Sequence, residues 1–83
     1  MNISLEISMY PLANEYVPAI QEFIDFLASC PDVAVKTNTM STQVFGLIDP
    51  VMNALRDGLK DAYRSDGKSV FVVKIINSDL RPE

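Results

Sequence analysis

The chain of 83 residues contains no histidine and a single cysteine, Cys30. Without histidine, one subunit cannot assemble the Ser-His-Asp or Cys-His groups that activate a nucleophile. A zinc site built from nitrogen and sulfur ligands is excluded for the same reason. Cys30 lies near the end of a predicted helix, where the helix dipole disfavours a thiolate, so we expect a structural cysteine. The lone thiol also fits a reducing cytoplasm.

Glycines and long hydrophobic runs are also scarce. Gly46, Gly58 and Gly67 are the three glycines, and they are too far apart to form a phosphate-binding loop. No apolar stretch approaches the ~20 residues that cross a bilayer. The N-terminus lacks the basic and apolar blocks of a secretory signal. We therefore expect a cytoplasmic protein with no membrane partner.

Acidic residues outnumber basic residues in the chain. Seven basic and eleven acidic residues give a net charge of −4. An acidic domain repels phosphate backbones, so nucleic acid is not an expected partner. The charge mildly favours a cationic ligand, although solubility alone also accounts for it.

Hydrophobic periodicity predicts six elements in one domain spanning residues 1–83. Residues 3–10 alternate strictly between apolar and polar, which is the pattern of a half-buried strand. Apolar residues recur at helical spacing from Val17 to Leu27, which predicts a helix over residues 16–29 that starts near Asn14 or Glu15. Asp49-Pro50 predicts a second helix with Asp49 as its N-cap. Further strands are predicted at residues 33–37, 42–45 and 70–76.

This βαββαβ order predicts an α+β, ferredoxin-like sandwich, in which a four-stranded antiparallel sheet carries two helices on one face. The other face of the sheet has no helix to cover it. Along the first strand that face would carry Ser4, Glu6, Ser8 and Tyr10, and the apolar last strand must add to it. Such a surface is expected to bind a ligand, a second subunit, or both.

Polar groups are concentrated in residues 37–42, between two predicted strands. In the expected topology these residues lie beside the first strand, so hydroxyls, a carboxylate and aromatic rings can converge. Rings can stack on a flat heterocycle or a cation, and the polar groups can hydrogen-bond ring nitrogens and an amine. A tight turn alone would also account for the hydroxyls. The candidate ligand-binding residues are Glu6, Ser8, Tyr10, Thr37, Ser41, Thr42 and Phe45.

Four segments carry a resemblance to a known family. They are residues 8–12 (SMYPL), 39–46 (TMSTQVFG), 49–52 (DPVM) and 79–81 (DLR). With these segments the chain resembles the YkoF-like thiamine-binding superfamily, small ferredoxin-like proteins of the former DUF77 type. The resemblance covers nearly the whole length. It implies binding of thiamine or its hydroxymethylpyrimidine moiety without catalysis or a cofactor, and assembly into homodimers or homotetramers.

The resemblance also ranks the candidate residues. Ser41 and Thr42 match the motif and are implied as ligand contacts, with Tyr10 next. The chain departs from the pattern at Phe45 and Leu47, where many relatives carry an acidic residue. Glu6 is then the expected source of negative charge for a cationic ligand.

Two other functions remain open on the residues. The first is an interaction module whose open sheet face packs against another copy or a larger enzyme. The second is a small enzyme of the dimeric ferredoxin-like barrel type. The absence of histidine and of a carboxylate pair disfavours that enzyme, because a lone carboxylate such as Glu6 is a weak acid–base catalyst.

Overall fold

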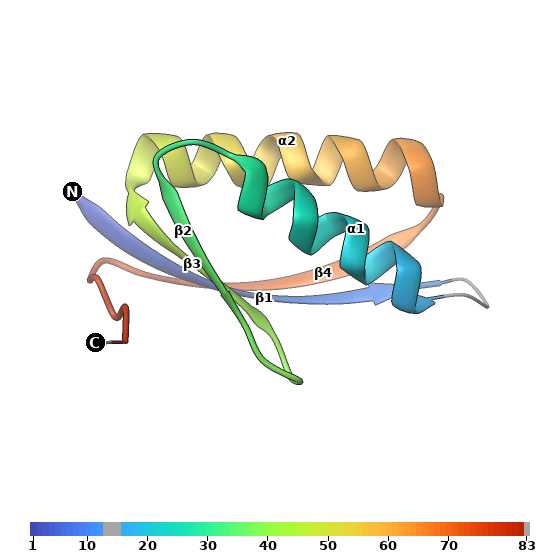
Figure 1. Cartoon of the computed structure of the whole chain (residues 1–83), viewed down its shortest axis with the longest axis horizontal. Coiled ribbons are helices and arrows are strands. Elements are labelled where there is room, and N and C mark those ends of the chain that lie inside the picture. The colour runs from blue at the N-terminus through green and yellow to red at the C-terminus, as the bar shows by residue number, and fades with distance from the viewer. Residues whose placement is uncertain (13–15, 83) are drawn as a thin grey trace.

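A computed structural model describes residues 1–12 and 16–82 of the chain. Its elements are β1 (Asn2–Pro11), α1 (Tyr16–Ser29), β2 (Val33–Thr37), β3 (Thr42–Leu47), α2 (Ile48–Asp66) and β4 (Ser69–Ile76). The strands form one sheet in the order β2-β3-β1-β4, and all neighbours are antiparallel. Both helices lie on the same face of the sheet (Figure 1). The predicted ferredoxin-like fold is confirmed.

The alternation in β1 determines which face of the sheet carries the core. Ile3, Leu5 and Ile7 are almost completely buried beneath the helices, where they meet Leu27 of α1 and Val51 of α2. Burying each of these side chains contributes roughly 1.5–3 kcal/mol, so the apolar side of β1 turns toward the helices. The polar side of β1 turns to the opposite face of the sheet, called the open face below.

Helix α1 has the predicted bounds, but its apolar stripe is rotated. Ala19, Phe23 and Leu27 are buried, whereas Val17, expected in the stripe, is 63% exposed. Ala19 faces the core, and Val17 is left on the outer side of the helix. The predicted start at Asn14 or Glu15 lies outside the described residues.

The start of α2 differs from the prediction. Leu47 is the N-cap, without a side-chain cap, and Asp49 lies in the first turn. The N–H of Ile48 donates to the Met1 carbonyl at 3.0 Å, so a tertiary contact supplies the partner that a capping side chain would give. β3 continues to Leu47 rather than ending at Phe45, and the helix follows without a loop. Asp49 and Pro50 still suit the first turn, where a carboxylate is favourable and an N–H is not needed.

Gly58 lets the two helices approach each other. A Cβ atom at this position would lie 3.1 Å from Phe23 Cε1 and 3.3 Å from Leu27 Cδ2. The close approach is therefore between α2 and α1. Within the described part of the chain, no helix is both long and apolar enough to cross a membrane.

The C-terminal segment, residues 77–82, is attached to the open face by one hydroxyl group. The Ser4 hydroxyl donates to the Ser78 carbonyl at 2.6 Å and accepts from the Leu80 N–H at 2.9 Å. The Arg81 guanidinium lies 5.9 Å from the centroid of the Phe45 ring. Ser4 is buried as a result, and Phe45 is covered on the face that the sequence predicted to be uncovered.

We expect Ser4→Ala to release this segment, because both hydrogen bonds depend on the same oxygen. The free energy of unfolding should fall by about 1–2 kcal/mol in urea titrations. The Leu80 amide should exchange its hydrogen faster. Ser8→Ala is the matched control, since Ser8 has no side-chain hydrogen bond among the described residues. Equal effects of the two substitutions would contradict the proposed attachment.

Candidate functional site

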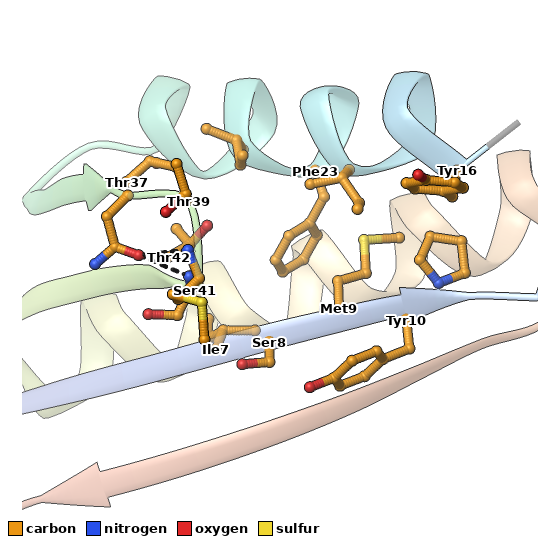
Figure 2. A pocket seen from close by; sticks show the side chains of 15 residues that line it. Ile7, Ser8, Met9, Tyr10, Tyr16, Phe23, Thr37, Thr39, Ser41 and Thr42 are labelled. Atoms are coloured by element: carbon orange, nitrogen blue, oxygen red, sulfur yellow. Dashed lines mark hydrogen bonds between the residues drawn. The ribbon is translucent and has the colours of Figure 1, made fainter.

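A cavity of about 380 Å³ opens between the start of α1, the end of β1 and the β2–β3 connection. We call it the site cavity (Figure 2). Its apolar wall comes from β1 and α1, and its polar wall comes from the connection. The lining residues are Ile7, Ser8, Met9, Tyr10, Pro11, Tyr16, Ile20, Phe23, Ile24, Thr37, Asn38, Thr39, Met40, Ser41 and Thr42.

The polar wall depends on the fold of residues 38–41. Asn38 Oδ1 accepts hydrogen bonds from the N–H groups of Met40 at 2.7 Å and Ser41 at 2.9 Å. The Asn38 N–H donates to the Ser41 carbonyl at 3.1 Å. The side chain thus replaces part of the strand ladder, as asparagine does in turns. The connection is irregular, and this lets the adjacent residues Ser41 and Thr42 both line the cavity, although neighbours in a regular strand face opposite ways.

Thr42 and Ser41 reach the cavity from different environments. Thr42 pairs with Ile7 on the helix side of the sheet and is only 4% exposed. Its hydroxyl has no hydrogen-bond partner among the described residues. Ser41 is half-buried, and its hydroxyl donates to Glu6 Oε2 at 3.1 Å. The Thr42 hydroxyl can therefore donate to, and accept from, a ligand in the cavity.

The apolar wall is partly aromatic. Phe23 extends from α1 toward Met9 of β1, and Tyr16 is the first residue of the same helix (Figure 2). Phe23 is held in place by Phe71, with the ring centroids 4.9 Å apart. Aromatic rings and a methionine sulfur are a good surface for a flat heterocycle. Strand parity places Met9 on the helix side of the sheet. The candidates predicted from the first strand lie on the open face, and Met9, Tyr16 and Phe23 were not among the predicted residues.

Five of the seven predicted residues line the site cavity, and two do not. Thr37, Ser41 and Thr42 form part of the polar wall. Ser8 and Tyr10 lie at the rim, and their side chains extend from β1 away from α1 (Figure 2).

Glu6 and Phe45 line a separate cavity of about 300 Å³ on the open face. Phe45 is 3% exposed and covered by the C-terminal segment, so its ring cannot stack on a ligand held by Thr42. The predicted role of Phe45 fails because residues 77–82, at the far end of the chain, fold back over it. Glu6 lies on the opposite face of the sheet from Thr42, so it cannot directly contact a ligand held by Thr42.

The described residues offer few groups for catalysis. They contain no cluster of three or more possible metal-binding side chains. The pKa of the Cys30 thiol is raised, first by burial and then by the negative charge of Asp57, which suppresses the nucleophilic thiolate. Cys30 lines a different cavity, beside Pro31 and Asn53. The site cavity is thus equipped for hydrogen bonding and stacking.

Solved structures resemble the whole described fold. A Streptococcus pneumoniae protein matches with a TM-score of 0.86 and 22% identity, over 96% of this chain and 90% of that one. A Thermotoga maritima protein provisionally assigned to thiamine biosynthesis or salvage matches at 0.81 and 14%, over 98% and 85%. A Bacillus cereus domain of unknown function of the DUF77 type matches at 0.78 and 14%, over 96% and 79%.

These similarities support the sequence-based resemblance at the level of fold. No protein-family model matches the chain, and no curated protein matches it. The structural neighbours include a DUF77 domain and a provisionally thiamine-related protein, as the resemblance led us to expect. TM-scores of 0.78–0.86 establish a shared fold, and identities of only 14–22% leave function to the residues of the site.

Proposed function

We propose that this protein is a non-catalytic binding protein for thiamine or its hydroxymethylpyrimidine moiety, held in the site cavity. The observation that carries the proposal is the Thr42 hydroxyl, which has no hydrogen-bond partner among the described residues and belongs to a residue that lines a cavity of about 380 Å³ together with Phe23 and Met9. That volume lies within the range of small-molecule pockets. The provisional thiamine assignment of one structural neighbour supports the choice of ligand.

The lining favours the pyrimidine ring over the cationic thiazolium ring. A flat pyrimidine can lie against Phe23 and Met9 while its polar edge reaches Ser41 and Thr42. Among the described residues that line the cavity there is no carboxylate, so none of them offers a negative charge to the thiazolium. The thiazolium is expected to lie at the rim, near Tyr10 and Tyr16, whose rings can interact with a cation.

Calorimetry tests this proposal directly. We expect saturable heat with thiamine and with the free hydroxymethylpyrimidine, at similar affinity, because the pyrimidine makes the buried contacts. The separate thiazole alcohol serves as the control and should bind much more weakly. An absence of heat with both pyrimidine compounds at millimolar concentration would overturn the proposal.

A second candidate function, self-association, is favoured by the open face. Val70 and Val72 of β4 pair with Tyr10 and Ser8 of β1, and their side chains share the open face with Ile76. Val70, Val72, Ile76 and Tyr10 are all exposed, Tyr10 by 56%. Adjacent half-exposed apolar side chains on one sheet face are typical of an interface. A second copy is the simplest partner, giving a homodimer or homotetramer, and this assembly is compatible with ligand binding behind the sheet.

We expect Val72→Asp to shift the protein to a monomer in light scattering, because a carboxylate buried in an apolar interface is costly. Val17→Asp is the matched control, since Val17 is an exposed valine on α1, away from the open face. It should leave the mass unchanged. A wild-type monomer at high concentration, or equal behaviour of the two variants, would rule out this interface.

A further inference from the structure

Glu6 lies on the open face of the sheet and is hydrogen-bonded to a residue of the site cavity. It lies in the middle of β1, paired with Gln43 on one side and Lys74 on the other. One carboxylate oxygen, Oε2, accepts from the Ser41 hydroxyl at 3.1 Å, and the other, Oε1, lies 3.7 Å from Lys74 Nζ. Glu6 does not line the site cavity, but its hydrogen bond with Ser41 connects it to a residue that does.

This hydrogen bond determines what Ser41 can offer. A carboxylate only accepts hydrogen bonds, and a serine hydroxyl has one hydrogen to donate. Because Ser41 gives that hydrogen to Glu6, its oxygen retains only lone pairs for the cavity. A ligand group beside Ser41 must then supply the hydrogen, as an amine does and a carbonyl oxygen does not.

We propose that Glu6 is a positioning residue that orients the Ser41 hydroxyl and makes the site select a heterocycle with an amino group over its oxo analogue. The proposal rests on the proposed function, because it assigns the selectivity of that same cavity. Glu6 thus acts on the ligand through Ser41, whereas the sequence predicted direct contact.

The selectivity is measured as a ratio of dissociation constants. The probes are the 4-amino hydroxymethylpyrimidine and the same compound with a 4-oxo group. Wild-type protein should bind the amino compound at least about tenfold more tightly, which is the value of one mismatched hydrogen bond. In Glu6→Gln the side-chain amide can donate to Ser41, which frees the serine hydrogen, so the ratio should fall toward one. Lys74→Met is the matched control: it changes the other neighbour of Glu6 and should keep the wild-type ratio.

A second measurement tests the positioning without a ligand. Glu6→Leu removes the acceptor of the Ser41 hydroxyl, so the Met40 and Ser41 amides should exchange hydrogen at least about threefold faster than in wild type or Lys74→Met. If wild type binds neither probe, the proposed function fails, and exchange still decides the role of Glu6. An unchanged ratio in Glu6→Gln, or unchanged exchange in Glu6→Leu, overturns the inference.

Discussion

Gly46→Val should lower the free energy of unfolding by about 3 kcal/mol or more, through backbone strain and overpacking together. Gly46 has φ of +152°, a conformation that residues with a side chain rarely adopt. A Cβ atom there would lie 3.0 Å from the Asp32 carbonyl oxygen and 3.3 Å from Val51 Cγ2. The first neighbour is backbone and the second belongs to the core, so neither can move cheaply. In a domain with roughly 5–15 kcal/mol of stability, this is a large loss.

Gly67→Ala is the control for the strain alone. Gly67 also has positive φ, +76°, but a Cβ atom there would meet nothing within 4 Å. Its cost should be roughly 1–3 kcal/mol, from the positive-φ backbone only. Urea unfolding followed by circular dichroism gives both values. If the two substitutions cost the same, crowding beneath α2 is not the reason for glycine at position 46.

The double substitution Ser41→Ala, Thr42→Val should weaken binding of the hydroxymethylpyrimidine about a hundredfold in calorimetry, since each lost hydrogen bond is worth about tenfold. Valine has nearly the shape of threonine and suits a strand, so the buried packing beside Ile7 should persist. A double variant that binds weakly but keeps its fold would show that the two hydroxyls contribute to ligand binding and not to the stability of the domain.

Ser29→Ala serves as the control for this pair. Ser29 also loses a hydroxyl, but its bond to the Phe26 carbonyl lies at the end of α1, and Ser29 is not among the residues that line the cavity. It should bind the ligand like wild type. Full affinity in the double variant would place the ligand away from Thr42.

Local patterns predicted most of the fold. β1 shows the clearest alternation in the chain, and this periodicity follows from the backbone itself, so no distant residue was needed to interpret it. The limits of α1 and β4 follow in the same way from apolar spacing and flanking turn residues. The start of α2 was misplaced by two residues because the partner of the Ile48 N–H is Met1, 47 positions away in the sequence. A capping pattern cannot include such a partner.

The candidate site was predicted only in part. The polar run at residues 37–42 could be recognised because hydroxyls exceed what a short turn requires. Its placement behind the sheet, against Phe23 and Met9, could not be recognised, because it depends on the Asn38 turn that brings adjacent residues to one cavity. Phe45 was misjudged for a related reason, since its cover comes from residues 77–82.

The amino-acid sequence by itself determined the order of strands and helices and the ferredoxin-like class. These follow from periodicity and composition, which act over a few residues. Tertiary structure alone decided that Thr42 lines the site cavity, that Phe45 is covered and that Glu6 meets Ser41. Each of these depends on contacts between segments far apart in the sequence, and such contacts form only when hydrophobic burial brings the segments together.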